Sequence, residues 1–203
     1  MSESPNEKDL LKETNPDIDR KYTYGDYIEW TDDKRYELIN GVVYMMVPAP
    51  APIHQEVLGN INRYFSNYLA DKECKVYFAP FDVRFPDVDE GNEDITTVVQ
   101  PDLLVVCDKD KLDDKGCKGA PDLIVEVVSP GSGGRDRKIK RDLYEKYGVK
   151  EYWLVDYQEK TIEVYTQKKE DNEYGKSDVY VEGDILTVGL FNDLEIEIDN
   201  IFT

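Results

Sequence analysis

Three side chains between residues 98 and 144 have the types and spacing of a site that could hydrolyse a phosphodiester: Asp102, Glu126 and Lys140. Asp102 lies within the apolar run VVQPDLLVVC, and Glu126 lies inside a second apolar run, APDLIVEVV. Both runs are rich in Val, Leu and Ile, so they are predicted to be strands covered on both faces. A carboxylate inside such a strand must be paired, hydrogen-bonded, protonated or bound to a metal, because its unpaired burial is costly.

A helix is predicted to follow the break at residues 129–134, and it carries Lys140 and Tyr144 on one face, four residues apart. A helix that leaves the end of the Glu126 strand could aim Lys140 back at the two carboxylates. Two acids that hold a divalent ion, beside a lysine that orients or activates water, form an arrangement suited to phosphodiester hydrolysis. The predicted metal ligands are therefore Asp102 and Glu126.

Each of these residues also has a purely structural explanation. Asp102 could cap the start of its strand, as Asp122 could in a second Pro-Asp-Leu segment. Glu126 could form a buried salt bridge, and Lys140 could form a surface ion pair with Asp136, four residues earlier. The sequence leaves these alternatives open.

The ordered motifs resemble the Uma family, restriction-endonuclease-like proteins within the PD-(D/E)xK nuclease superfamily. The motifs that carry the resemblance are RYELINGVVYMM, the PxxHQ segment that ends at Gln55, FDVRF at 81–85, VVQPDLLVVC with Pro101-Asp102, Glu126, DRKIK from 136 and LYEKYGVKEYWLVD ending at 156. They cover most of the chain from residue 22 onward. The superfamily pattern places a lysine two positions after the glutamate, where this chain has Val128. The Uma pattern takes its lysine from the following helix instead, where Lys140 matches and Lys138 competes.

The resemblance implies two further site residues. Glu37 would be a carboxylate close to the site and a candidate third ligand for the metal or for water. The alternative is a cross-strand charge on a solvent-facing surface. His54, the only histidine in the chain, would contact phosphate or a metal-bound water. The alternative for His54 is an exposed, incidental residue in the first turn of a helix.

The activity that the resemblance implies is that of a Mg²⁺-dependent endonuclease acting on DNA. Mn²⁺ should substitute for Mg²⁺, because the ligands are hard oxygen donors. Cutting both strands of a duplex with one site per chain would favour a homodimer. The alternative is a nuclease-like fold without catalytic activity that serves as an acidic protein-binding or assembly module.

The net charge of −19 over 203 residues is the main argument against a nucleic-acid partner, because Lys and Arg supply most of the affinity for phosphates. The charge is unevenly distributed, however. Residues 134–150 hold seven basic and three acidic side chains, a local charge of +4 on the predicted site helix. A solvated helix face explains this basic stretch equally well.

Composition predicts one domain over residues 21–203 after a disordered, polar tail over residues 1–20. No apolar run approaches the roughly 20 residues of a membrane helix, and the start lacks the pattern of a secretory signal. Three cysteines without paired spacing and a single histidine do not make a zinc pattern. We therefore expect a protein of the reducing cytoplasm, without a membrane partner.

The predicted fold is α/β, with a restriction-endonuclease-like core, a mixed β-sheet flanked by helices, and an N-terminal β-hairpin. The hairpin is predicted at Asn40-Gly41, the strongest short-range hairpin signal. The other predicted elements are a short helix from 23, a long helix over 53–69, a strand over 75–85 with an irregularity at Pro80, a buried strand over 151–156, and alternating strands toward the C-terminus. The charged segment 108–119 is predicted to be a solvated connector.

Overall fold

The structure, a computed structural model, describes residues 20–31, 33–46, 50–128, 136–168 and 173–203. These residues form two compact units, one from 20–46 and 84–99 and the other from 50–83 and 100–203. The predicted disordered tail lies, except for Arg20, outside the described residues. The single domain over 21–203 stays a prediction.

The first unit contains a small antiparallel sheet. Its central strand β1 (Tyr36–Ile39) pairs with β2 (Val42–Met45) on one side and with β5 (Val98–Val99) on the other. Asn40 and Gly41 connect β1 to β2 with φ angles of 51° and 77°. Asn and Gly tolerate positive φ best, and this turn suits the twist of a hairpin. The predicted N-terminal hairpin is confirmed.

A short helix completes the first unit. α1 (Tyr24–Tyr27) starts at Thr23, whose hydroxyl accepts the Asp26 N–H while the Asp26 carboxylate accepts the Thr23 N–H. This reciprocal cap satisfies two donors that a helix start leaves unpaired. The buried core of the unit consists of Tyr22, Tyr24, Leu38, Ile95 and Val98.

The second unit is built around a six-stranded sheet with the order β12-β11-β10-β9-β6-β3. Its strands are β3 (Lys75–Phe78), β6 (Leu103–Val106), β9 (Leu123–Val128), β10 (Glu151–Asp156), β11 (Thr161–Thr166) and β12 (Asp178–Tyr180). β9 and β10 run parallel, and the other neighbours run antiparallel. The sheet is therefore mixed, as predicted. β4 (Val83–Arg84) lies where the chain passes from the second unit to the first.

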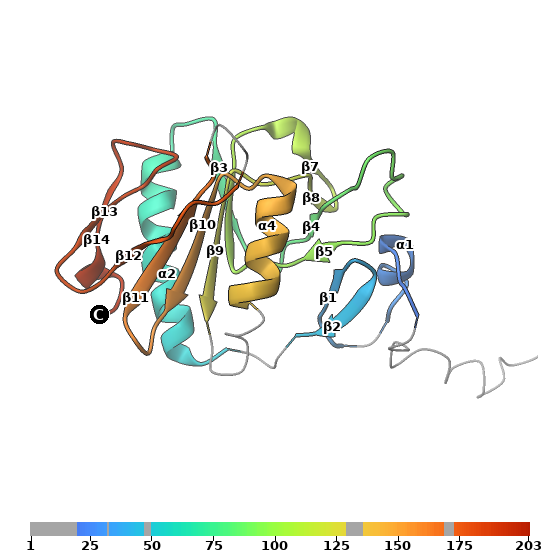
Figure 1. Ribbon diagram of the computed structural model, residues 1–203, viewed down its shortest axis with the longest axis horizontal. Helices are drawn as coiled ribbons and strands as arrows, with labels where there is room; N and C mark the ends of the chain where they lie inside the picture. Colours follow the sequence, from blue (N-terminus) through green and yellow to red (C-terminus); the bar gives the residue numbers. More distant parts are fainter. Residues whose placement is uncertain (1–19, 32, 47–49, 129–135, 169–172) are drawn as a thin grey trace, which may run out of the picture. The chain divides into compact units, whose positions relative to one another are not determined.

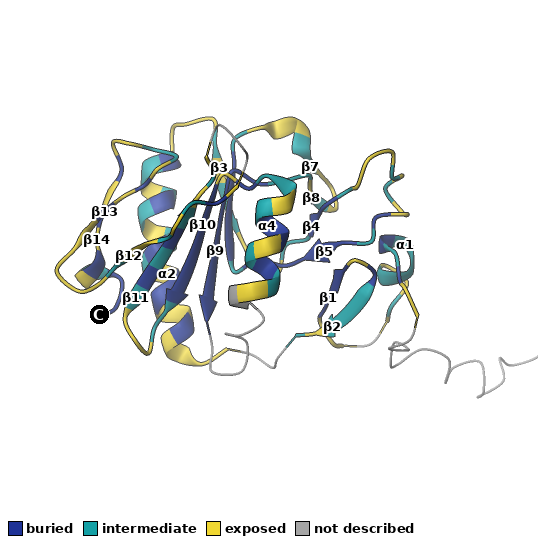
Figure 2. Ribbon diagram, in the orientation of Figure 1, coloured by how far each residue is buried: buried dark blue, intermediate teal, exposed yellow. Residues whose placement is uncertain are grey.

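Two helices cover opposite faces of this sheet (Figure 1). α2 (Pro52–Leu69) packs Ile61 and Phe65 into a core that includes Val125 and Val127 of β9. Side chains alternate along a strand, so Glu126 faces the other way, toward α4 (Arg141–Tyr147). Figure 2 shows that β9 and β10 are buried along almost their whole length. The charged residue of β9 thus lies in a fully covered layer.

The remaining elements of the second unit are short. They are η1 (Lys109–Lys111), β7 (Leu112–Asp113), β8 (Gly116–Lys118), β13 (Ile185–Thr187), β14 (Glu195–Glu197) and η3 (Ile198–Asn200). β7 and β8 form a hairpin, and Cys117 on β8 is fully buried. The segment 108–119 is mostly solvent-exposed, as predicted, but it is not a plain connector, because it contains this hairpin and a buried cysteine. The Cys117 N–H donates to the carbonyl of the distant Asp82, at 2.9 Å, and the local sequence gives no sign of such a partner.

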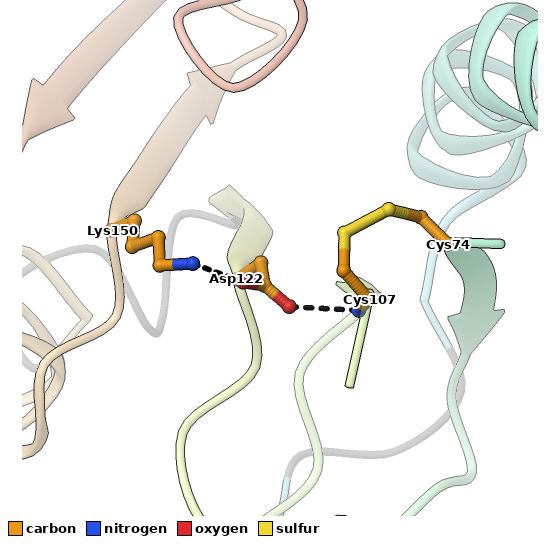
Figure 3. The surroundings of a disulfide bond; sticks show 4 residues. All are labelled: Cys74, Cys107, Asp122 and Lys150. Atoms are coloured by element: carbon orange, nitrogen blue, oxygen red, sulfur yellow. Dashed lines mark hydrogen bonds and ion pairs between the residues drawn. A yellow bond between two sulfur atoms is a disulfide. The ribbon is translucent and has the colours of Figure 1, made fainter. Parts of the chain in front are cut away.

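A disulfide between Cys74 and Cys107 joins the start of β3 to the end of β6. Asp122 lies beside it (Figure 3): one carboxylate oxygen accepts the Cys107 N–H at 2.7 Å, and the other accepts the Lys150 ammonium at 2.6 Å. The number and spacing of the cysteines gave us no reason to expect this bond. The cytoplasmic location stays a prediction. Among the described helices, none combines the length and the hydropathy that crossing a bilayer requires.

Removing the disulfide is expected to lower the free energy of unfolding by about 3–4 kcal/mol, the loop-closure value for a separation of 33 residues. Urea unfolding of the Cys74→Ser/Cys107→Ser variant, against the oxidised parent, measures this. A reducing agent should shift the parent toward the variant and leave the variant unchanged. Equal unfolding midpoints for oxidised parent and variant would contradict the prediction.

Candidate active site

Glu126 is the centre of a buried polar cluster in the second unit. It occupies the fourth position of β9 and is 4% exposed. Its Oε1 atom accepts two bonds from one helix, one from the Lys140 ammonium at 2.8 Å and one from the Tyr144 hydroxyl at 2.6 Å. Lys140 is 3% exposed, and Tyr144 is fully buried. A buried carboxylate therefore meets a buried ammonium group, as the charge of each requires.

The helix reaches Glu126 through an irregular first turn. A π-helical turn, Asp136–Lys140, continues directly into α4. The helix ends at Gly148, which has a φ of 82° and donates its N–H to the carbonyls of Tyr144 and Glu145. A left-handed glycine of this kind is a frequent helix stop. The four-residue spacing of Lys140 and Tyr144 then places both side chains over the same carboxylate.

The two candidate lysines differ in their surroundings. Lys140 lies inside the cluster, in contact with Glu126, whereas Lys138 is exposed. The geometry favours Lys140 as the lysine of the site.

Asp102 comes directly before β6, the strand that pairs with the Glu126 strand. β6 and β9 pair antiparallel with Leu103 opposite Val125, so Asp102 comes one residue beyond the paired stretch, at the end where Glu126 lies. The Oδ2 atom of Asp102 accepts the Val127 N–H at 2.8 Å. Asp102 thus does cap a strand backbone, and this role is compatible with a place in the site.

Asp102 and Asp122 cap the two ends of the same strand pair. Asp102 precedes β6 and accepts an N–H from β9, while Asp122 precedes β9 and accepts the Cys107 N–H just beyond β6. The aspartates of the two Pro-Asp-Leu segments therefore have the same structural role. Only the Asp102 end carries Glu126, so Asp122 is a natural control for Asp102.

His54 belongs to the same unit and contacts Asp102. Its Nε2 atom lies 3.3 Å from Oδ2 of Asp102. His54 is 6% exposed, so it is not the exposed histidine of the alternative, and its role in the site stays a prediction. Its Nδ1 atom is buried and has no hydrogen-bond partner among the described residues. The sequence could not reveal this pairing, because His54 and Asp102 are 48 positions apart in the chain and lie on a helix and a strand edge.

Glu37 lies in the first unit, on β1, opposite Tyr44 of β2. It is fully buried, so the alternative of a charge on a solvent-facing surface is wrong. Its role near the site stays a prediction. The other four predicted site residues, His54, Asp102, Glu126 and Lys140, all belong to the second unit.

Tyr144 is a member of the cluster that we did not predict as a site residue. Its four-residue spacing from Lys140 was the available signal. Tyrosine at that spacing is also common in helix cores, and only the 2.6 Å bond to Glu126 separates the two cases.

The donor chemistry of the cluster fits a magnesium ion held by two protein ligands. Mg²⁺ prefers oxygen donors and commonly binds one or two carboxylates, with water and substrate phosphate completing its shell. Asp102 and Glu126 supply two such carboxylates. Within the described ranges, no group of three or more His, Cys, Asp or Glu side chains could hold a metal ion. These residues therefore do not supply a coordination shell made of protein ligands alone.

The fold is nuclease-like. The structure is similar to the crystal structure of a "putative nuclease belonging to DUF820" from Anabaena variabilis ATCC 29413, with a TM-score of 0.70 and 17% sequence identity. The match covers 89% of this chain and 97% of that one. The predicted fold class, a mixed α/β nuclease-like fold, is confirmed.

The family follows from the sequence. Residues 24–199 match the family model Uma2, described as "Putative restriction endonuclease". The chain belongs to the Uma2 family, as its motifs indicated. A comparison with curated proteins finds no match.

Proposed function

We propose that this protein is a Mg²⁺-dependent endonuclease that hydrolyses phosphodiester bonds of DNA. The observation that carries the proposal is the buried contact between Glu126 and Lys140, 2.8 Å long, on the strand next to Asp102. Membership of a family described as restriction endonucleases supports the same conclusion. A carboxylate and an ammonium group of this kind, beside a second carboxylate, are the parts that phosphodiester hydrolysis requires.

Each residue of the cluster has a role in this proposal. Asp102 and Glu126 would hold Mg²⁺, which supplies water activation and stabilises the leaving oxygen when bound. The Lys140 ammonium would orient the attacking water by donating a hydrogen bond to it and would stabilise the charge that develops on the phosphate, while the metal ion lowers the pKa of the water. The Val127 N–H donates to Oδ2 of Asp102 and Nε2 of His54 lies 3.3 Å from the same oxygen, so the orientation of this carboxylate is set before substrate arrives.

The basic stretch that we expected to face DNA is partly occupied by protein partners. The Lys140 ammonium contacts Glu126, and the Lys150 ammonium contacts Asp122. Arg141 contacts both Asp142 and Glu145. Lys138 is exposed. These ion pairs neutralise part of the positive charge counted for residues 134–150. Affinity for DNA would therefore depend more on the bound Mg²⁺.

The net charge of −19 supports a second candidate function. A nuclease-like fold without activity could present this acidic surface to a protein partner, as an assembly module. Cleavage of supercoiled, linear, single-stranded and RNA substrates in Mg²⁺ or Mn²⁺ separates the two functions, since a binding module cuts none of them. Cleavage of both duplex strands would further favour a homodimer, the predicted assembly.

Metal binding is expected to require both carboxylates. In calorimetric titrations with Mg²⁺ and Mn²⁺, Asp102→Asn and Glu126→Gln should weaken binding by at least roughly 100-fold, because each removes a charged oxygen donor. Asp122→Asn, the matched control at the opposite end of the strand pair, should bind as the parent does. A parent that binds neither ion, or two site variants that bind both ions normally, would contradict the proposal.

A further inference from the structure

The Oε1 atom of Glu126 receives two donors of different charge from one helix. The Lys140 ammonium is a cation, whereas the Tyr144 hydroxyl is neutral. A carboxylate that also holds a divalent ion has less attraction left for an ammonium group, because the two cations repel each other. A neutral hydroxyl does not suffer this repulsion. The two bonds should therefore respond differently when a metal ion is bound.

The backbone and ring of Tyr144 are firmly anchored. Its carbonyl accepts the N–H groups of Gly148 and Val149 at 3.1 and 3.0 Å. Its ring contacts Tyr152 edge to face with centroids 5.0 Å apart, and Tyr152 in turn stacks on Tyr165 at 5.8 Å. Lys140, in contrast, lies at the junction of the π-helical turn and α4 and has a long, flexible side chain. The Tyr144 hydroxyl is thus held in place next to Glu126, whereas the Lys140 ammonium can change position.

Packing alone does not explain the hydroxyl of Tyr144. The ring would fill the same space as phenylalanine, and burying a hydroxyl costs free energy unless it finds a partner. Its bond to Glu126 compensates that cost and at the same time fixes the rotation of the carboxylate. Carboxylates that bind metal ions are commonly oriented by a hydrogen bond of this kind from a residue that does not itself bind the ion.

We propose that Tyr144 is a positioning residue that keeps the Glu126 carboxylate oriented for Mg²⁺ while the Lys140 ammonium turns to the water and the phosphate. This inference rests on the proposed function, since it assigns Tyr144 a role in the same site. Tyr144 itself touches neither substrate nor reacting atoms. Its contribution is to the affinity for the ion and not to the chemical step.

The test compares Tyr144→Phe with a matched control, Tyr174→Phe. Tyr174 is also buried, and its hydroxyl donates to the Val149 carbonyl at 2.8 Å, so the control loses a comparable hydrogen bond without touching Glu126. Calorimetric titration with Mn²⁺ should show binding about tenfold weaker in Tyr144→Phe and unchanged in Tyr174→Phe. Thermal unfolding of both variants confirms that each remains folded and loses similar stability.

Cleavage of supercoiled plasmid at a series of Mn²⁺ concentrations gives the second readout. Tyr144→Phe should need about tenfold more Mn²⁺ for half-maximal rate, while its kcat at saturating Mn²⁺ stays within about threefold of the parent. Equal Mn²⁺ affinity in the two variants, or a fall in kcat that saturating Mn²⁺ does not restore, would overturn the role of Tyr144 and leave the proposed function standing. A parent that binds no Mn²⁺ would overturn the proposed function and this inference with it.

Discussion

Replacing Lys140 by methionine is expected to lower the free energy of unfolding by about 3–5 kcal/mol at neutral pH. The variant leaves the buried Glu126 carboxylate without the Lys140 ammonium. Because the Glu126 side chain is only 5% exposed, water cannot replace the lost partner. Urea unfolding monitored by circular dichroism measures the change. Lys138→Met is the control: Lys138 is exposed, so its loss should change stability by less than about 0.5 kcal/mol.

A triple variant shows whether the loss comes from an orphaned charge. Glu126→Leu, Lys140→Met and Tyr144→Phe together remove all three polar groups, so no buried charge is left without a partner. Such replacements are often neutral or stabilising, and the triple variant should recover most of the lost stability. A triple variant as unstable as Lys140→Met alone would mean that packing, and not charge, dominates here.

The same substitution tests the chemistry. Lys140→Met should reduce the rate of DNA cleavage by at least about 100-fold at a temperature where the variant remains folded, because charge on the phosphate loses its stabilising group. Lys138→Met should cut as the parent does. The reverse pattern, an active Lys140→Met and an inactive Lys138→Met, would reassign the site lysine.

Trp153→Ala is expected to destabilise the second unit by about 3–5 kcal/mol, the usual cost of deleting a large buried aromatic side chain. Trp153 is fully buried on β10, and its ring packs against Phe65 of α2 with centroids 5.5 Å apart. Its indole N–H also donates to Oε1 of Glu151 at 2.7 Å, so the variant loses both packing and a hydrogen bond.

Two comparisons sharpen this prediction. Trp153→Phe keeps most of the packing and should cost less than Trp153→Ala in the same urea experiment. Phe78→Ala removes an aromatic side chain that is 56% exposed on β3, so its cost should stay near 0.5 kcal/mol. If Phe78→Ala cost as much as Trp153→Ala, burial would not be the cause.

Local signals made much of the fold predictable. Asn40-Gly41 fixed the hairpin, because few other dipeptides accept two positive φ angles. The helix predicted over 53–69 is observed as α2, and the strand predicted over 151–156 is observed as β10. The helix shows a continuous helical spacing of apolar residues, and the strand is a short, mostly apolar run that is buried at almost every position. The single strand predicted over 75–85 is wrong: β3 ends at Phe78, a cis peptide bond follows at Ala79–Pro80, where the irregularity was predicted, and β4 belongs to another sheet.

The features that we missed depend on partners far away in the sequence. The β7–β8 hairpin is held by the carbonyl of Asp82, and the disulfide joins two cysteines without paired spacing. The π-helical turn before α4 has no signal that distinguishes it from an ordinary helix start.

The candidate site shows the same division. Lys140 was predictable because it is close to Glu126 in sequence and shares a helix face with Tyr144. The contact of His54 with Asp102 was not, because it joins α2 to the start of β6. Spacing indicates which residues can meet within one element, but only packing decides which elements meet.

The buried carboxylate of Glu151 has a consequence for behaviour in acid. It accepts N–H groups from Trp153, Leu190 and Gly189, yet burial raises its pKa above the ordinary value of a glutamate despite these donors. The folded chain therefore takes up a proton at Glu151 at a higher pH than the unfolded chain does. Proton uptake at this residue favours the folded state as the pH falls from the raised value toward the ordinary one. Mild acidification also reduces the self-repulsion of a chain with a net charge of −19, so both effects act in the same direction.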